Sequence, residues 1–141
     1  MDADDWAHPE KIYRQLRAIE DNNAVASVSY WVRFDAKGQP WSLNSYPYLS
    51  LNRSSFMFEF NKVLSISDND LIWDCVRFGG DLNLMTKIER FYGIKSIVKI
   101  KLPLSIGRKL ENSLTNSAGS GNRSVRGRYL RAAIYETNFN F

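Results

Sequence analysis

The spacing of apolar residues predicts a helix near the start of the chain. Ile12, Leu16 and Ile19 recur every three or four positions, and charged residues fall on the other faces between residues 8 and 23. Pro9 suits the first helical turn, because the N–H that proline lacks is not needed there. We therefore expect an amphipathic helix whose apolar face is formed by these three residues.

Strict alternation of apolar and polar residues then predicts β-structure from residue 24 onwards. The apolar positions of the first strand are Val28, Tyr30, Val32 and Phe34. A turn is predicted at residues 35–38, where Asp and Gly supply a side-chain hydrogen bond and a positive φ. A second strand should run from about Trp41 to Leu51, and Pro47 favours an edge strand or a break within it.

Alternation resumes at residues 54–67 and predicts a further strand. It would place Phe56, Phe58 and Phe60 on one face. Residues 67–80 are ambiguous, since their apolar residues fit a helical face that residue 67 or 68 would cap and Gly79 would end.

The clearest pattern in the second half of the chain is helical. Between residues 81 and 93, the helical face is formed by Leu84, Met85, Ile88, Phe91 and Tyr92. The next stretch, residues 94–104, alternates as a strand, with Val98, Ile100 and Leu102 facing inward and Lys99 and Lys101 facing outward.

A late helix is predicted over residues 105–117, where Ile106, Leu110 and Leu114 lie four apart and Gly107 weakens the pattern. A flexible basic loop should follow at residues 116–127, and a last strand at residues 128–136. Because strands and helices are interspersed without regular alternation, we expect an α+β fold in a single domain, residues 1–141. A mostly antiparallel sheet would carry the N-terminal helix and the late helix.

The inventory of reactive residues argues against an enzyme. With one histidine, His8, and one cysteine, Cys75, the chain cannot form a four-ligand zinc site or an internal disulfide. No nucleotide-binding or hydrolase motif occurs, and the calcium-loop start at residues 68–70 lacks the required Gly and closing Glu. We therefore expect no catalytic residues, no metal and no cofactor. The acidic start and the lack of a long apolar run predict a soluble or peripheral protein.

Charge is unevenly distributed along the chain. Residues 1–86 carry a balance of −4, whereas residues 87–131 carry +9, which suggests an anionic partner. Arginine with glycine and serine suits phosphate binding, and nearby tyrosines could stack on bases, so binding would be insensitive to sequence. The candidate residues for RNA or anionic-lipid binding are Lys95, Lys99, Lys101, Arg108, Lys109, Arg123, Arg126, Arg128 and Arg131. A solvated basic face, and a plain linker at residues 116–127, remain the alternatives.

Two further features bear on assembly. Tyr46, Pro47 and Leu49 match a Tyr-Pro-x-Leu docking motif of the kind that viral structural proteins use in budding, although an edge strand with a proline explains the same letters. The chain also holds nineteen aromatic residues, more than a small interior accommodates. Phe139, Phe141 and Trp31 are our candidates for self-association, and Phe139 and Phe141 could instead close the protein's own core.

Residues 28–51, VSYWVRFDAKGQPWSLNSYPYLSL, and residues 91–118, FYGIKSIVKIKLPLSIGRKLENSLTNSA, resemble the small matrix proteins of non-segmented negative-strand RNA viruses. The similarity is greatest to the bornavirus type, and a nyamivirus or a distant rhabdovirus matrix protein fits as well. It covers about half of the chain.

The resemblance implies a homo-oligomeric viral matrix protein that lies under the virion envelope. Such a protein would bind the anionic inner membrane surface and RNA or the nucleocapsid, and would support assembly and budding from the host cytoplasm. It also implies strand rather than helix at residues 81–93. The alternative function is a small nucleic-acid-binding module without sequence specificity.

Overall fold

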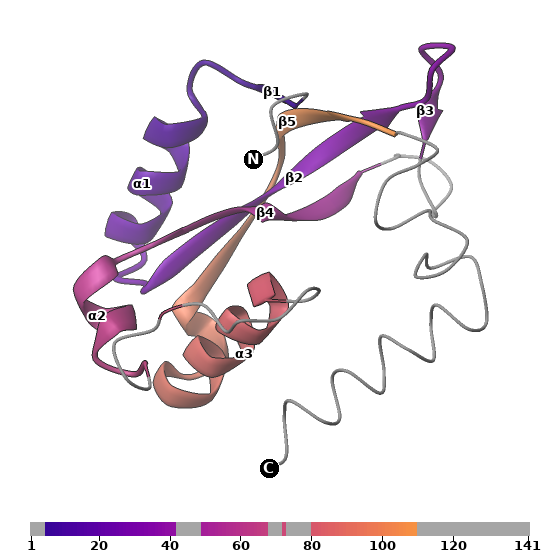
Figure 1. The fold of residues 1–141 in the computed structure, drawn as a ribbon. Coiled ribbons are helices and arrows are strands. Elements are labelled where there is room, and N and C mark those ends of the chain that lie inside the picture. The colour runs from indigo at the N-terminus through magenta and orange to yellow at the C-terminus, as the bar shows by residue number, and fades with distance from the viewer. Residues whose placement is uncertain (1–4, 42–48, 68–71, 73–79, 110–141) are drawn as a thin grey trace, which may run out of the picture.

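The computed structural model describes residues 5–41, 49–67, 72 and 80–109 (Figure 1). The elements in chain order are β1 (Trp6–Ala7), α1 (Lys11–Asp21), β2 (Ala26–Phe34), β3 (Pro40–Trp41), β4 (Ser50–Phe58), α2 (Phe60–Leu64), α3 (Gly80–Tyr92), the 3-10 helix η2 (Ile94–Ser96) and β5 (Ile97–Arg108).

The sheet is organised around β2. One edge of β2 pairs in parallel with β5, from Ala26 opposite Ile97 to Phe34 opposite Arg108. The other edge pairs antiparallel, first with β4 and then, beyond Trp31, with the short β3. β1 adds an antiparallel edge to the end of β5. The predicted α+β class is therefore confirmed, with one domain and a five-stranded, mostly antiparallel sheet.

The two long helices cover opposite faces of β2. Val28 belongs to the apolar core, which α3 completes with Leu84 and Ile88. The neighbouring Ser27 points the other way, and its hydroxyl donates a hydrogen bond to the main chain of α1 at Gln15. Since successive side chains of a strand alternate between faces, the apolar core lies on the α3 side and a polar layer on the α1 side.

The helix predicted at residues 81–93 is confirmed as α3. Leu84, Met85 and Ile88 are buried as its periodicity predicts, and Gly93 ends the helix with a φ of 92°. The strand that the family resemblance implied for this stretch is wrong. One member of the expected apolar face also differs, because Phe91 is 68% exposed.

The strand predicted over residues 54–67 is wrong beyond Phe58, and this includes the position of Phe60. β4 ends at Phe58 because its partner β2 begins at Ala26, and the last bond of this pairing runs from the Glu59 N–H to the Val25 carbonyl. The chain then turns into α2, which buries Val63 and leaves Phe60 exposed. Phe56 and Phe58 do lie together, with ring centroids 5.6 Å apart.

The start of the late helix predicted at residues 105–117 is also wrong, because Ser105–Arg108 extend β5 along β2. A Cβ at Gly107 would lie 2.6 Å from the Trp31 ring, so the glycine allows the two strands to pack closely there. The register between Ile100 and Ser105 is shifted by a bulge. This bulge leaves Leu102 exposed, although the alternation placed it inward.

Some predictions lie outside the described residues. They are the middle of the strand expected from Trp41 to Leu51, nearly all of residues 68–79, the later part of the expected helix, and the loop and last strand that follow it.

The orientation of α1 differs most from expectation. Its buried residues are Lys11 and Gln15, whereas Ile12 is 65% and Leu16 46% exposed. The Gln15 side-chain amide donates to the Ser55 carbonyl at 2.7 Å and reaches the Ser27 carbonyl at 3.4 Å. Ile19, the third residue of the expected face, is partly buried. The fully buried contacts of the helix are nevertheless polar, so hydrogen bonds set its orientation on the sheet.

The polar layer continues across the sheet through short side chains. Ser55 lies in a bulge of β4, where its hydroxyl accepts the Ser29 N–H at 2.9 Å in place of a ladder bond. It also donates to the Asn52 carbonyl at 2.7 Å. The Asn52 amide reaches the Ser105 hydroxyl of β5 at 2.7 Å. The layer thus joins α1, β2, β4 and β5.

Replacing Gln15 with methionine should destabilise the protein. Met has a similar length but no N–H, so the buried carbonyls of Ser27 and Ser55 would lose their donor at a cost of about 1–3 kcal/mol. The free energy of unfolding from urea titration measures the loss. The neighbouring Leu16→Gln should change it by less than about 0.5 kcal/mol in dilute protein, because Leu16 faces outward. A larger loss of free energy of unfolding for Leu16→Gln than for Gln15→Met would contradict this orientation of α1.

Gly107→Ala should lower the free energy of unfolding by about 1–3 kcal/mol, because the methyl group overlaps the Trp31 ring. The penalty should shrink in a Trp31→Leu background, where the ring is absent, and a double-mutant cycle measures the coupling. Gly93→Ala is the matched control. Its methyl group meets open space, so its cost arises from backbone strain and should not depend on Trp31.

Candidate nucleic-acid interface

The structure divides the predicted basic residues into two groups. Lys95, Lys99 and Lys101 lie on η2 and the first half of β5, and all three are exposed. Arg108 and Lys109 lie at the far end of β5, on the order of 20 Å away along the strand. Arg123, Arg126, Arg128 and Arg131 are outside the described residues. The described lysines and arginines therefore do not form one continuous patch.

The first group is partly neutralised. The Lys99 ammonium lies 3.7 Å from the Glu89 carboxylate of α3. The pair is largely exposed, so it contributes little stability, but it reduces the positive potential on this part of β5. The first group is the weaker candidate for holding an anion.

The second group is part of a mixed cluster of rings and cations. The Arg33 guanidinium lies 4.8 Å from the Trp31 ring centroid and 5.4 Å from that of Trp41. The Lys109 ammonium lies 4.3 Å from the Trp41 centroid. We call Trp31, Arg33, Trp41 and Lys109 the tryptophan–cation cluster. Its separations are within the range of favourable cation–π contacts.

Three segments of the chain build this cluster. Alternation along β2 directs Trp31 and Arg33 to the same face. The hairpin after β2 returns so that Trp41 lies opposite Arg33. The Lys109 N–H donates to the Phe34 carbonyl at 2.8 Å, which fixes the end of β5 beside the hairpin. Figure 1 shows this hairpin at the end of the sheet away from α2 and α3.

The hairpin turn is built as the sequence predicts. The Asp35 carboxylate accepts the N–H groups of Lys37 and Gln39 at 2.8 and 2.9 Å, and Gly38 has a φ of 75°. The hydrogen bond from the Gln39 N–H, followed by that from Lys37, lowers the pKa of Asp35, and the charges of Lys37 and Lys109 lower it further. The ionised form of Asp35 therefore stabilises the turn.

Positive charge exceeds negative charge at this end of the sheet. Arg33, Lys37, Arg108 and Lys109 lie here, and the described acidic residues beside them are Asp35 and Asp5. Arg108 and Lys37 are exposed. The Arg108 carbonyl accepts a long hydrogen bond from Arg33 at 3.4 Å, and this bond helps to orient the guanidinium.

Sequence reasoning missed Arg33, Lys37 and Trp41 as site residues. The signal was present in the sequence: Trp31 and Arg33 lie two apart before a predicted turn, and a second tryptophan, Trp41, follows the turn. Hairpin register would have placed Trp41 beside them. Trp31, expected at a self-association surface, is half-buried and packs inside the chain against Gly107 and Arg33. Phe139 and Phe141 are outside the described residues.

The docking motif is also largely outside the described residues, since Tyr46 and Pro47 are not described and only Leu49 is. His8 lies before α1, where its Nδ1 accepts the Glu10 N–H at 3.1 Å. In the described part of the chain, no three His, Cys, Asp or Glu residues are grouped to hold a metal ion. None of the helices in the same ranges is long and apolar enough to cross a bilayer.

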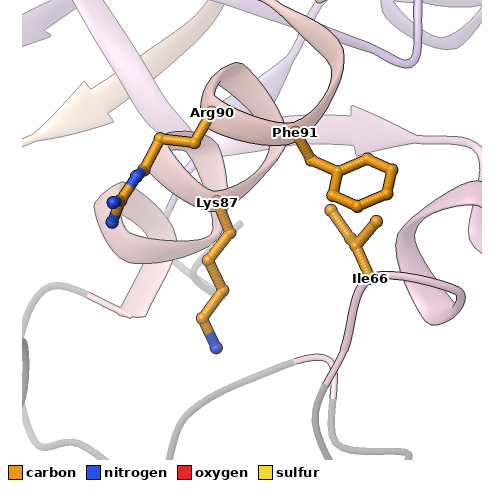
Figure 2. Close-up of a pocket in the computed structure, with 4 residues that line it drawn as sticks. All are labelled: Ile66, Lys87, Arg90 and Phe91. Carbon is orange, nitrogen blue, oxygen red and sulfur yellow. The ribbon is translucent and has the colours of Figure 1, made fainter. Parts of the chain in front are cut away.

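A shallow pocket of about 260 Å³ lies on α3, lined by Ile66, Lys87, Arg90 and Phe91. Figure 2 shows Phe91 facing Ile66 across it and the two basic side chains extending along its other side. Lys87 and Arg90 both take part in interactions within the chain. We assign no ligand to this pocket.

The chain matches no protein-family model, and no curated protein is significantly similar to it.

Replacing Asp35 with asparagine tests the turn. Asn keeps a side-chain acceptor but loses the charge, so it should lower the melting temperature at neutral pH. Because the pKa of Asp35 is lowered from 3.8 in the folded protein, the stabilisation is present above that value and is lost as the pH falls through the folded pKa. The difference between wild type and Asp35→Asn should therefore vanish in strong acid. If the difference in melting temperature were independent of pH, it would not arise from the charge of Asp35.

Proposed function

We propose that the protein is a non-enzymatic RNA-binding protein that holds RNA without sequence specificity at the hairpin end of its sheet. The tryptophan–cation cluster is the observation that carries this proposal. Guanidinium and ammonium groups suit phosphate oxygens, and indole rings suit unpaired bases, whatever the sequence. Both kinds of group meet at this end of the sheet, and three segments hold them there.

The continuity of the chain supports the same site. The basic segment with Arg123, Arg126 and Arg128 follows Lys109 in sequence, so it is tethered to the end of the sheet that carries the cluster. A tethered basic segment has a high effective concentration at this site and would add phosphate contacts. RNA binding at the cluster therefore does not require a continuous positive surface that reaches the lysines of the first half of β5.

The resemblance to small viral matrix proteins suggests a setting for this activity. In that setting the protein would link RNA or the nucleocapsid to the inner face of the envelope as part of a self-assembled layer. The Trp41 ring favours RNA over lipid headgroups as the partner of the cluster, because it offers a stacking surface for bases. An acidic membrane surface is the alternative anion, and the experiment below separates the two.

The test removes charge at one end of the sheet and leaves the other end intact. The triple variant Lys37→Gln, Arg108→Gln, Lys109→Gln should weaken binding of a short unstructured RNA by at least about tenfold, and should reduce the slope of log K against log salt by roughly 2. Fluorescence anisotropy over a salt series measures both. The matched control, Lys95→Gln, Lys99→Gln, Lys101→Gln, removes the same charge from the other group and should leave the slope nearly unchanged.

Equal losses in the two triple variants would mean that binding is diffuse, and no loss in either would contradict RNA binding at the cluster. Flotation with phosphatidylserine vesicles completes the test. If the first triple variant abolishes flotation and leaves RNA affinity unchanged, the cluster is a lipid site. Trp41→Leu should weaken RNA binding at all salt concentrations without changing the slope, because it removes a ring and no charge.

A further inference from the structure

A set of apolar side chains on α1 faces away from the sheet. Ile12 and Tyr13 are each 65% exposed and Leu16 is 46% exposed. Leu16 lies four residues after Ile12 and three after Tyr13, so the three side chains form one strip along the outer side of the helix. We call Ile12, Tyr13 and Leu16 the α1 apolar strip. A surface helix normally turns such a strip toward the core, so its exposure is unusual.

The contacts of α1 explain why the strip faces outward. Gln15 is fully buried and its hydrogen bonds to Ser27 and Ser55 fix the rotation of the helix. A rotation of α1 that turned Leu16 inward would break these hydrogen bonds. It would also move Lys11 out of its buried position. Burial lowers the pKa of Lys11, and the nearby Asp5 charge opposes that shift.

The exposed area is large enough to form an interface. From their exposed fractions, the three residues present roughly 400 Å², which is in the range at which an apolar patch on a small protein marks an interaction site. Figure 1 shows α1 at the side of the sheet, with its outer surface away from α3 and from the hairpin.

The charges beside the strip disfavour RNA and acidic membranes as its partner. Arg14 pairs with Glu10 at 2.7 Å, and Arg17 pairs with Glu20 at 3.1 Å and with Asp21 at 2.9 Å. The exposed side of α1 thus carries more carboxylates than cations. A helix that binds a membrane surface would instead carry lysine and arginine on its polar face. The strip therefore fits an apolar protein surface.

The ends of α1 indicate what that protein surface is. The first turn holds no acidic residue and the last turn no basic one, while Glu20 and Asp21 lie at the C-terminal end. Carboxylates there oppose the helix dipole. In an antiparallel pair of α1 helices, Glu20 and Asp21 of each copy lie beside the positive N-terminal end of the other. Arg17 pairs with both carboxylates in its own helix, and Glu10 at the N-cap of the partner is paired with Arg14. The positive end of the partner helix then adds to the compensation that Arg17 supplies.

We propose that the α1 apolar strip is a homodimer interface, in which α1 packs antiparallel against α1 of a second copy about a two-fold axis. Ile12 of one copy then lies beside Leu16 of the other, and the same patch serves both subunits. The two strips together bury roughly 800 Å², less than a standard stable interface. The dimer is therefore weak, with a dissociation constant on the order of micromolar or higher. This inference does not depend on RNA binding.

The experiment uses the full chain and measures mass over a concentration series by sedimentation equilibrium. Wild type should pass from monomer to dimer, and Leu16→Glu should stay monomeric with an unchanged melting temperature in dilute solution. Ile94→Glu is the matched control, because Ile94 is 77% exposed on η2, away from α1. It should dimerise as wild type does. RNA affinity of the Leu16→Glu monomer, measured with immobilised RNA at low occupancy, should be unchanged.

Mixing tests the antiparallel arrangement. Leu16→Glu and Ile12→Lys should each be monomeric alone, and an equimolar mixture should form a heterodimer because the new charges face each other across the interface. A parallel pair would place equivalent residues together and would not be rescued. The proposal is overturned by a wild type that remains monomeric at high concentration or by a Leu16→Glu variant that still dimerises. A lowered melting temperature of Leu16→Glu at every concentration, without a change in mass, would show that the chain covers the strip itself.

Discussion

The buried amide of Gln15 is the contact on which the arrangement of this protein depends. It joins α1 to two strands by donating to main-chain carbonyls, and Ser27 returns a hydrogen bond to α1. A buried polar group is costly unless it is paired, so these bonds fix the rotation of the helix more strictly than apolar packing would. With Gln15 directed inward, Leu16, about 100° further round the helix, is directed outward, and Ile12 lies one turn before Leu16 on the same strip. The exposed strip is thus a consequence of the polar layer.

On the opposite face of the sheet, apolar residues form a buried core. Among the described residues, this core lies at one end of the sheet and does not extend to the hairpin end. Val28, Leu84 and Ile88 form an apolar core beneath α3, near the start of β2. The far end of β2 extends beyond β4, and there tryptophan rings and cations pack in place of a core. Cation–π contacts are stable while half-exposed, because the charged groups remain partly hydrated. This part of the sheet can therefore be ordered and remain accessible to an anion.

The sequence predicted the elements whose signal is local and misplaced those that depend on a partner. The first helix, the strand from Val28, the Asp35 turn and the helix at Leu84 each carry their pattern within a few residues. The residues after Pro103 have the periodicity of a helix, yet β2 supplies hydrogen bonds that extend them as strand, which no local pattern could reveal. Likewise, a helical pattern identifies an apolar strip but cannot tell whether that strip faces a core.

The two proposed surfaces are related by geometry. Within one copy, the α1 apolar strip and the tryptophan–cation cluster lie on different parts of the fold, so one copy can pair through the first and bind RNA through the second. A two-fold pair would carry two clusters that can engage one strand. The second contact is then intramolecular, and its effective concentration raises the overall affinity without any new interaction. In turn, an RNA that holds two copies close together favours a dimer that is weak by itself. RNA binding and dimerisation would then reinforce each other, because a coupling free energy between two binding equilibria acts equally in both directions.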